Sequence, residues 1–555
     1  MSYPDEYHIR RYNFKVDIYN KFEQNAQKHP DKPAFIYWDK TNWQTLTYAD
    51  ILDQSERFFR RLRAGSLTPG MTAAVMTPPS AAFFPFALAL LKFGIVPIIL
   101  DPAVGLRKLG EILTESQPDI FIGNGLTHVL RILFGWGKSS IKHNLSISKI
   151  ESGKWKAQPS SAFHSTLPKD TAAIIYTSGS TGLPKGAVYS QENLSAQLDL
   201  LQAAFDISPD EIDLPAFPLY ALIDLLLGVT SVIPDITFPV PGKTDPEKVI
   251  NAIQKFNVTN MFASPVVLEI LSKYNSTLPV KLSSLKRIIT AGAPATIDLQ
   301  KGFRQLLDEH TDLFGIYGAT ETLPIAKVES REIFALKEKT EHGAGICLGK
   351  PIDGVTVRII PIRDEPIEEW QDSLAVESNV VGEITVQSPA TTRSYIHRPD
   401  ADRISKIPGH CEDDSPKQSN EPIQRDEAEV IHRMGDVGYF DEEGRLWYCG
   451  RKSHRVITKD GVMFTEQIEN IFNAHPQVYR TALVGVDGEP IVWVEIKSGA
   501  KADKEKVIEE LKSLGKTHPQ ASRIQRFLFI KKFPTDVRHN SKIIREKLAQ
   551  LITDN

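Results

Sequence analysis

A loop rich in small and hydroxyl residues carries the clearest chemistry in this sequence. It spans residues 176–186, and its polar or flexible members are Thr177, Ser178, Gly179, Ser180, Thr181, Gly182 and Lys185. Glycines let backbone N–H groups surround a polyphosphate, and a lysine adds positive charge. Lys185 is followed by Gly186, not by Ser or Thr, so the spacing is not that of a Walker A loop. The loop predicts nucleotide binding, although a glycine-serine stretch taken alone is equally typical of a linker.

Two later segments carry groups that suit the base and the phosphates of a nucleotide. Residues 291–294 include Gly292, Ala293 and Pro294, and residues 317–321 read Tyr317, Gly318, Ala319, Thr320 and Glu321. An aromatic such as Tyr317 offers a face to a purine, and Gly318 lets the backbone approach closely. Glu321 supplies a hard oxygen of the kind that Mg²⁺ prefers.

Three charged residues complete the set. Asp436 and, later, Arg451 combine a short acceptor with a planar donor, which suits the cis-diol of a ribose. Lys542 lies near the end of the sequence. Taken singly, Lys542 is more typical of a solvated surface, Asp436 of a turn and Tyr317 of a core.

The elements that must position these groups alternate between helix and strand. Residues 48–62 have helical spacing before Gly65, and residues 81–100 indicate a helix followed by a buried strand. Short apolar runs predict strands at 73–76, 172–177, 258–262, 287–290 and 312–317. Such alternation predicts an α/β fold of doubly wound subdomains, with parallel sheets covered by helices on both faces.

The pattern changes after Gly343. Alternating runs at 355–360 and 382–387 predict a smaller antiparallel, β-barrel-like module, and the charged stretch 406–429 predicts a surface insertion or disordered loop. A further helix ends at Gly515. We therefore predict a large N-terminal domain of residues 1–452 and a small, mobile α+β C-terminal domain of residues 453–555 that carries Lys542.

Composition narrows the functional classes. The chain has 555 residues and a formal net charge of −4, so it lacks the basic footprint of a nucleic-acid-binding protein. Three cysteines without metal spacing, and an N-terminus without a secretory signal, indicate reduced thiols in the cytoplasm. Lys92 and two prolines interrupt residues 81–100, so we expect no integral membrane segment. Residues 126–143 mix apolar and basic side chains, which leaves peripheral lipid contact as a hypothesis beside a half-buried surface element.

In their order, these motifs resemble those of the superfamily of adenylate-forming enzymes, which includes acyl-CoA synthetases, luciferases and the adenylation domains of peptide synthetases. Residues 291–294 resemble its adenine-edge loop, and residues 317–321 resemble its Tyr-Gly-x-Thr-Glu motif. Asp436 and Arg451 match its ribose-binding pair, and Lys542 matches its C-terminal lysine, although Ser541 replaces the usual glycine. Ser453 stands at the hinge position, where Asp or Lys is common.

The resemblance implies that ATP and Mg²⁺ are used and that pyrophosphate and AMP are released. It implies a nucleotide site built from the loop, the adenine edge, residues 317–320, Asp436, Arg451 and Lys542. Within that site it implies catalytic roles for Thr177, Lys185, Glu321 and Lys542, and binding of the metal by Glu321. Lys542 would act in adenylation, and hinge rotation would then withdraw it.

Several stretches are similar to one narrower family, the β-lactone synthetases of bacterial long-chain olefin biosynthesis. They are residues 214–224, 432–440, 446–451, 464–467 and 536–542. Pro218 follows Phe217 at a point where many acyl-CoA synthetases have histidine. This resemblance implies that a 2-alkyl-3-hydroxy fatty acid is activated as its acyl-adenylate, and that its own hydroxyl then closes a β-lactone. The resemblance also implies that partner enzymes of an olefin pathway act with this chain.

Other features of the reaction stay open. We predict an acyl pocket at Phe217, Leu219, Tyr220 and Val266. His539 is a candidate base for ring closure because it lies near Lys542 in sequence, and a structural hydrogen bond is an equal alternative. A fatty acyl-CoA ligase, an enzyme that loads a carrier protein, and a nucleotide-binding pseudoenzyme are the alternatives, in falling order. Chain length, stereochemistry and oligomeric state are not defined by the sequence.

Overall fold

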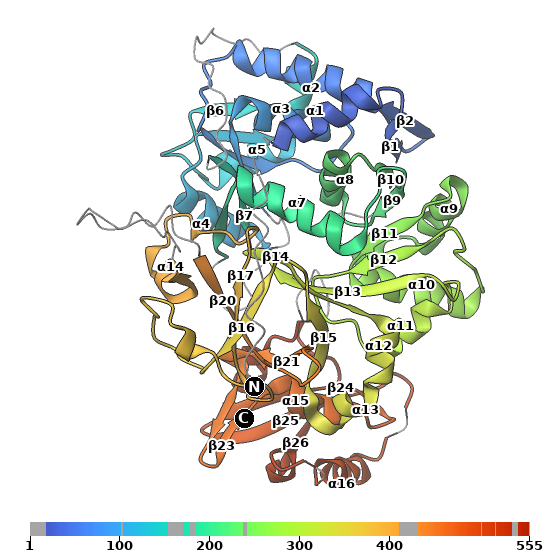
Figure 1. The fold of residues 1–555 in the computed structure, drawn as a ribbon, viewed down its shortest axis with the longest axis vertical. Helices are drawn as coiled ribbons and strands as arrows, with labels where there is room; N and C mark the ends of the chain where they lie inside the picture. The colour runs from blue at the N-terminus through green and yellow to red at the C-terminus, as the bar shows by residue number, and fades with distance from the viewer. Residues whose placement is uncertain are drawn as a thin grey trace.

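The computed structural model describes residues 18–100, 104–153, 170–177, 184–236, 241–409, 430–500, 502–516, 518–535 and 542–553. Within them the predicted α/β class is confirmed: a large N-terminal domain is followed by a smaller C-terminal domain (Figure 1). Several positions named above lie outside the described residues, namely Ser178, Gly179, Ser180, Thr181, Gly182, His539 and Ser541, and so does Cys411, one of the three cysteines. Cys347 and Cys449 are buried free thiols, as predicted.

A seven-stranded sheet positions the two ends of the glycine-rich loop. Its order is β18-β8-β7-β4-β3-β5-β6, and its strands are β3 (Thr72–Met76), β4 (Val96–Ile99), β5 (Ile120–Gly123), β6 (His143–Leu145), β7 (Thr171–Tyr176), β8 (Gly186–Ser190) and β18 (Ser394–Tyr395). Strands β3 to β7 pair in parallel, whereas β8 is antiparallel to β7. The loop therefore connects two antiparallel strands, unlike the strand-to-helix connection of a P-loop.

The second sheet has fourteen strands, and one half of it is mainly parallel. This half follows the order β13-β12-β11-β9-β10-β1-β2, and its strands are β1 (Pro33–Trp38), β2 (Trp43–Thr47), β9 (Ile212–Pro215), β10 (Thr230–Ile233), β11 (Asn260–Ala263), β12 (Arg287–Thr290) and β13 (Asp312–Ala319). Strand β12 has the predicted bounds. Strand β11 starts two residues later than predicted, because Asn257 adopts a left-handed conformation after the preceding helix and the chain turns before it can extend.

The other half of this sheet is the predicted antiparallel module. Its strands are β14 (Thr322–Glu329), β15 (Ile346–Pro351), β16 (Thr356–Ile360), β17 (Gly382–Gln387), β19 (Lys406–Pro408), β20 (Val430–Phe440) and β21 (Leu446–Arg451). Strand β14 of this module pairs with β13, so the module continues the sheet whose other half is mainly parallel. The predicted start of the insertion at residue 406 is wrong, because Lys406–Pro408 forms strand β19 and pairs with β20.

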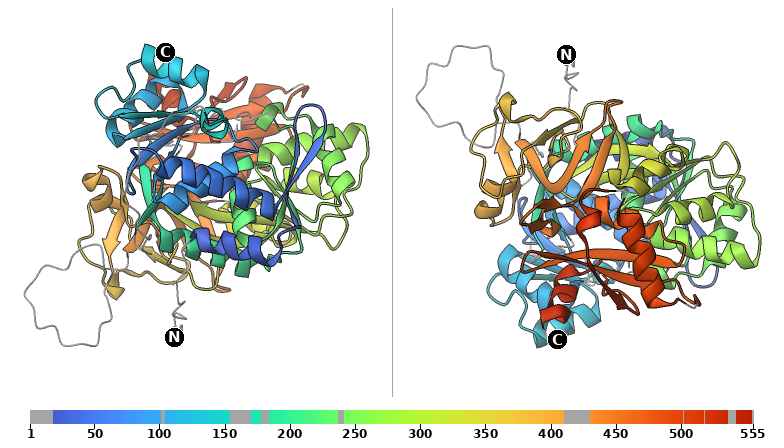
Figure 2. Two further views of the ribbon diagram at one scale, coloured as in Figure 1. Left: turned by 90° about the horizontal axis from the view of Figure 1, so that it is seen from above. Right: turned by 90° about the horizontal axis from the view of Figure 1, so that it is seen from below.

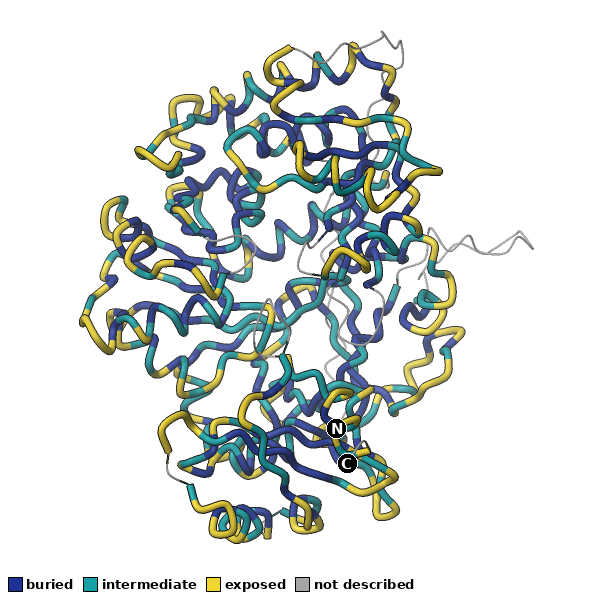
Figure 3. Tube along the Cα trace, turned by 180° about the vertical axis from the view of Figure 1, so that it is seen from behind, coloured by how far each residue is buried: buried dark blue, intermediate teal, exposed yellow. Residues whose placement is uncertain are grey.

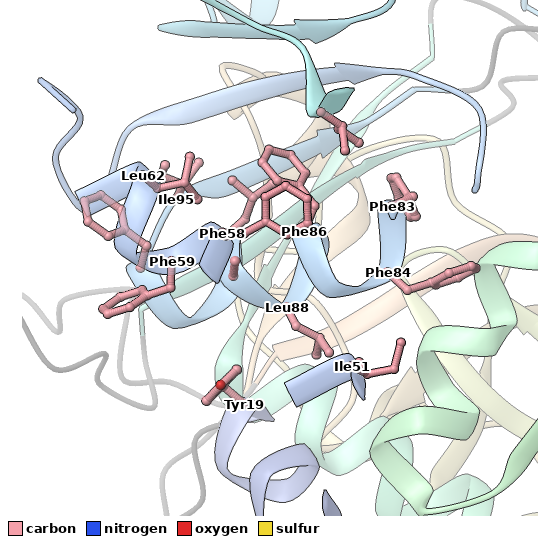
Figure 4. Close-up of a cluster of buried hydrophobic side chains, with 14 of the residues drawn as sticks. Tyr19, Ile51, Phe58, Phe59, Leu62, Phe83, Phe84, Phe86, Leu88 and Ile95 are labelled. Atoms are coloured by element: carbon pink, nitrogen blue, oxygen red, sulfur yellow. The ribbon is translucent and has the colours of Figure 1, made fainter. Parts of the chain in front are cut away.

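Helices cover both sheets. Those of the N-terminal domain are α1 (Ile18–Lys28), α2 (Tyr48–Arg63), α3 (Phe83–Phe93), α4 (Leu106–Ser116), α5 (Gly125–Leu133), α6 (Ile147–Glu151), α7 (Gln191–Phe205), α8 (Ala221–Leu227), α9 (Pro246–Phe256), α10 (Pro265–Thr277), α11 (Ile297–Arg304), α12 (Ser330–Ala335), α13 (Lys337–Lys339) and α14 (Pro399–Ser405). Side chains of α2 and α3 form much of one core, where Phe58 and Phe86 meet edge to face at 5.3 Å (Figure 4). No helix among the described residues is long and apolar enough to cross a membrane.

The C-terminal domain has its own sheet and core. It contains β22 (Val456–Thr458), β23 (Gly461–Met463), β24 (Val478–Val486), β25 (Glu489–Ile496) and β26 (Arg526–Ile530), together with α15 (Thr465–Asn473), α16 (Lys504–Gly515) and α17 (Arg545–Thr553). Helix α16 ends at Gly515, as predicted. A cluster of buried apolar side chains from α15, α16 and the strands fills its interior, seen as dark blue tube at the base of Figure 3.

Candidate active site

Thr177 and Lys185 close the base of the glycine-rich loop. The Thr177 N–H donates to the Lys185 carbonyl at 2.9 Å, and the Lys185 N–H donates to the Thr177 hydroxyl at 3.2 Å. The Lys185 ammonium lies 5.0 Å from the centre of the Tyr395 ring. Burial lowers the pKa of Lys185, and the charge of Glu321 opposes that lowering. The two loop ends therefore hold a lysine beside the carboxylate of a distant segment.

Glu321 is fixed by residues that come from far along the chain. Its Oε1 accepts a hydrogen bond from the Tyr395 hydroxyl at 2.5 Å, and its carbonyl accepts one from the Thr392 N–H at 2.8 Å. Burial, reinforced by Glu321, raises the pKa of Tyr395, so the phenol stays protonated and donates. The Thr320 carbonyl accepts a hydrogen bond from the Tyr189 hydroxyl. The carboxylate thus has one oxygen committed to Tyr395 and a backbone held in place.

Asp436 joins the two halves of the fourteen-stranded sheet. It accepts a hydrogen bond from the Tyr317 hydroxyl at 2.7 Å and one from the Arg451 guanidinium at 2.8 Å. Strand register explains the second contact, because Asp436 and Arg451 are direct partners in the β20–β21 pair. Burial and the Asp436 charge raise the pKa of Tyr317, which keeps its hydroxyl a donor. Tyr317, Asp436 and Arg451, which the sequence places far apart, form one hydrogen-bonded group.

The predicted adenine edge lies at the same end of the sheet as Tyr317. Strands β12 and β13 are parallel, and Thr290 at the end of β12 pairs with Gly315 in β13. The turn that follows β12 contains Gly292 at φ +94°, a conformation that favours glycine. Ala293 and Pro294 complete this turn. Residues 292–294 and 317–320 therefore lie at the same edge of the sheet, and open parallel sheets commonly bind ligands at this edge.

Lys542 is exposed and belongs to the C-terminal domain. Its neighbour Ile543 forms a bridge with Thr535, and Arg545 makes a buried ion pair with Glu469 of α15 at 2.9 Å. Burial lowers the pKa of His454 to about 4, and the charges of Arg545 and Arg451 contribute to that lowering. The segment that carries Lys542 is therefore anchored close to the strand that supplies Arg451.

The segment between the domains contains Ser453. Lys452–His454 forms a single 3₁₀ turn in which Ser453 is exposed. On one side Lys452 pairs with Glu383 at 3.0 Å, and on the other Arg455 pairs with Asp364 at 2.5 Å. Both partners belong to the N-terminal domain, so the turn is held at its two ends while Ser453 is not enclosed.

A cavity of about 60 Å³ lies between helices α7 and α8 and the parallel strands. Tyr220 lines it and stacks on Phe262 at 3.6 Å between ring centres. The other predicted acyl-pocket residues lie nearby but are not among those that line this cavity in the described structure. Phe217 contacts the edge of Tyr220 at 6.0 Å, Leu219 packs against the α2–α3 core, and Val266 lies beside Gly242.

One wall of this cavity carries a pair of carboxyl groups that the sequence analysis missed. Asp213 and Asp224 are buried and hydrogen-bonded to each other, and the Ser231 hydroxyl donates to Asp224 at 2.5 Å. Burial raises the pKa of Asp213 to about 7, and burial together with Asp213 raises that of Asp224 well above its usual range. The pair therefore holds a proton near neutral pH. Only the alternation of β9 and the helical phase of α8 could have indicated their contact.

Two buried basic residues near Glu321 were also missed. The Lys406 ammonium donates to the Thr392 carbonyl at 2.6 Å and lies 5.3 Å from the centre of the Tyr395 ring. Burial lowers its pKa to about 8. His432, its partner in the β19–β20 register, donates from Nδ1 to the Ser405 carbonyl at 3.0 Å. Lys406 lies between Ser405 and Ile407 in the sequence, so one apolar neighbour was the available signal for a buried strand.

Comparison with known proteins identifies relatives of this arrangement. The sequence model of a family described as AMP-binding enzyme matches residues 22–396. An olefin β-lactone synthetase of Xanthomonas campestris pv. campestris is 42% identical over 520 residues, covering 91% of this chain and 90% of its own length. One of Stenotrophomonas maltophilia is 40% identical over 519 residues, covering 91% of each chain. In fold, the chain is similar to O-succinylbenzoate coenzyme A synthetase of Bacillus subtilis in complex with AMP, with a TM-score of 0.73, 21% identity, and coverage of 95% and 98% of the two chains. That enzyme also has a structure with ATP and a magnesium ion.

Proposed function

Since the chain belongs to the family of AMP-binding enzymes, and within it groups with the olefin β-lactone synthetases, we propose that it activates a long-chain 2-alkyl-3-hydroxy fatty acid with ATP and closes the adenylate to a β-lactone. The hydrogen-bonded group of Tyr317, Asp436 and Arg451 is the observation that supports nucleotide binding. Glu321, four residues after Tyr317, and Lys185 both contact Tyr395. The proposal for the acid comes from the two relatives of 40–42% identity.

In the first half-reaction a carboxylate oxygen attacks the α-phosphorus, the bond to the bridging β-phosphate oxygen breaks, and pyrophosphate leaves. Charge builds on the α-phosphate as this happens, so cations are needed there. Lys185 and the loop that begins at Thr177 would bind the phosphates, and Lys542 would approach the α-phosphate from the C-terminal domain. Tyr317 and residues 292–294 would border the adenine, while Asp436 would accept the ribose hydroxyls.

The residues present fit a magnesium ion. Mg²⁺ is usually held by one or two carboxylates together with substrate phosphates and water. Glu321 offers a carboxylate whose second oxygen does not bond Tyr395, close enough to the Lys185 ammonium for their charges to interact. When bound, the ion would supply charge neutralisation at the phosphates. Tyr395 and Thr392 would hold the Glu321 side chain and backbone in place for such an ion.

In the second half-reaction the 3-hydroxyl oxygen of the same molecule bonds to the activated carbonyl carbon. The carbonyl-to-phosphate oxygen bond breaks, AMP leaves with that oxygen, and the hydroxyl proton is lost. The nucleophile is tethered, so orientation replaces recruitment of a second substrate. The mixed anhydride offsets the strain of a four-membered ring. His539 remains a proposed base on sequence position alone.

The cavity under Tyr220 is the proposed path for part of the hydrocarbon. Tyr220 and Phe262 form its aromatic wall, and Phe217 lies next to them. A proton held by the Asp213–Asp224 pair would reduce the negative charge that an uncharged hydrocarbon chain meets in this cavity. Leu219 and Val266 stay proposed contacts, with Leu219 facing the α2–α3 core.

We place the domain boundary between residues 452 and 453, with Ser453 as the hinge. Support comes from its exposure and from the separate core of the residues that follow. Rotation there would withdraw Lys542 after adenylation, since backbone torsions at a single turn can swing a whole domain. A cytoplasmic location is proposed because ATP is consumed and two buried thiols are free. Enzymes that make the hydroxy acid and consume the lactone are the proposed partners, and contact with lipid is expected for so apolar a substrate.

The main competing function is a fatty acyl-CoA ligase, which shares the first half-reaction. The two differ when the purified chain is incubated with ATP, magnesium and a synthetic 2-alkyl-3-hydroxy acid, without and then with coenzyme A. We expect β-lactone and AMP in equal amounts in both mixtures, identified by NMR. A thioester formed only with coenzyme A, and no lactone, would replace our proposal by the ligase. Absence of pyrophosphate release in both mixtures would instead favour the pseudoenzyme, and dependence on an added carrier protein would favour carrier loading.

A further inference from the structure

Helix α5 exposes a stripe of large apolar side chains. The helix has a capping box in which Asn124 and Thr127 satisfy each other's backbone groups, yet none of its residues is buried. Leu126, Val129, Ile132 and Leu133 are 67%, 61%, 71% and 73% exposed. Positions 126, 129 and 133 recur every three to four residues, so they share one face of the helix. Exposed apolar groups that are contiguous in this way mark an interaction surface.

The opposite side of the same helix is fixed to the protein. Leu130 packs against the core that contains Trp136, and the His128 ring donates from Nε2 to the Leu145 carbonyl at 3.1 Å. The Arg131 guanidinium lies 5.6 Å from the centre of the Phe121 ring. Phe134, which ends the helix and is half-exposed, stacks on the buried Trp136 at 5.4 Å. These contacts fix the rotation of α5, so its apolar stripe points outward.

The charged residues within the segment that carries the stripe are all basic. Residues 124–143 contain Arg131, Lys138 and Lys142 with two histidines and no Asp or Glu, although the whole chain has a net charge of −4. Lys138 is exposed in the turn that follows α5, and Lys142, exposed just before β6, lies 3.5 Å from the Asp119 carboxylate. The light-blue to cyan part of the chain that contains this segment lies at the edge of the molecule in both views of Figure 2. An apolar stripe flanked by basic side chains complements a surface that is apolar inside and negative outside.

We propose that α5 docks on an anionic lipid surface, with Leu126, Val129, Ile132 and Leu133 inserted at the level of the headgroups and Lys138 against the lipid phosphates. We choose an anionic lipid surface as the partner because the charged residues of segment 124–143 are all basic. Packing against a second copy of this chain would not require that bias. Lipid docking is a property beyond the proposed reaction. It does not depend on whether the adenylate reacts with its own hydroxyl or with coenzyme A.

The test uses the full chain and flotation with vesicles. One set is phosphatidylcholine mixed with phosphatidylglycerol, and the other is phosphatidylcholine alone. We expect the bound fraction on the mixed vesicles to exceed that on neutral vesicles at least about tenfold, and to fall with added salt. The variant Val129→Ser/Ile132→Ser/Leu133→Ser should lose this binding while keeping the melting temperature, because the replaced side chains lie outside the core.

A matched control separates this stripe from exposed apolar groups in general. Leu278 and Ile457 are 55% and 60% exposed and lie in other parts of the fold, so Leu278→Ser/Ile457→Ser should bind vesicles as the wild type does. Equal binding by the triple variant, or no binding by the wild type, overturns the proposal. Self-association of the wild type that the triple variant abolishes, without vesicle binding, assigns the stripe to a second copy instead. Pyrophosphate release from a short soluble acid should be the same in all variants, so failure here is distinct from failure of the proposed reaction.

Discussion

Replacing Lys542 by alanine is expected to reduce pyrophosphate release about 10²–10³-fold, which is the usual cost of removing one group that stabilises transition-state charge. In our account the lysine acts only while charge builds on the α-phosphate. Conversion of a presynthesised acyl-adenylate to lactone and AMP should therefore stay within about threefold of wild type. Both rates are measured on the same preparation, the first by coupled pyrophosphate detection and the second by chromatography.

The control for this variant is Lys547→Ala. Lys547 is exposed on α17, five residues after Lys542, so its loss changes the same net charge on the same segment. We expect it to leave both half-reactions unchanged. If Lys542→Ala slows the two half-reactions equally, the division of labour between the domains is wrong, and Lys542 has a structural role or acts throughout.

Replacing Asp436 by alanine has the second largest expected effect. The variant removes the acceptor shared by Tyr317 and Arg451, and with it the proposed acceptor for the ribose hydroxyls. A charge-assisted hydrogen bond is worth about 1.5–3 kcal/mol, so kcat/KM for ATP should fall about 10²-fold. The wild type should discriminate against 2′-deoxy-ATP by about tenfold or more, whereas the variant should discriminate by less than about threefold.

This discrimination is the readout that a merely structural carboxylate would not change. Asp441 offers the comparison, because it is also buried and accepts hydrogen bonds from Arg445 and Trp447 in the same β20–β21 hairpin. Asp441→Asn should lower the melting temperature and preserve the preference for ATP over 2′-deoxy-ATP. If the Asp436 variant retains the full preference of the wild type, Asp436 does not bind the ribose.

Much of the site could be predicted because its residues sit at positions that local sequence defines. Tyr317 lies near the carboxyl end of a strand, Gly292 in the turn after the preceding strand, and Asp436 and Arg451 face each other across a hairpin. At such positions the backbone geometry restricts which residue fits, and the order of the motifs along the chain indicates that the positions belong to one candidate site.

The residues that were missed depend on contacts between remote segments. Tyr395 reaches Glu321 only because β18 pairs with β8, the strand that follows the glycine-rich loop, and Lys406 is buried only because β19 pairs with β20. The Asp213–Asp224 pair likewise requires a particular packing of α8 on β9. No spacing in the sequence encodes these distances. Leu219 is assigned to the acyl pocket from its place in the sequence, and that assignment stays a prediction; in the fold it packs against the α2–α3 core.

In the proposed reaction this site joins the carboxyl group of one molecule to AMP, and the hydroxyl of that molecule then displaces AMP. Transfer of an oxygen isotope from the acid distinguishes this route from others. The acid is labelled with ¹⁸O in both carboxyl oxygens and converted without coenzyme A. We predict one ¹⁸O atom in the AMP phosphate and one in the lactone carbonyl, with the unlabelled hydroxyl oxygen in the ring. Unlabelled AMP, or a lactone that keeps both ¹⁸O atoms, would contradict the account.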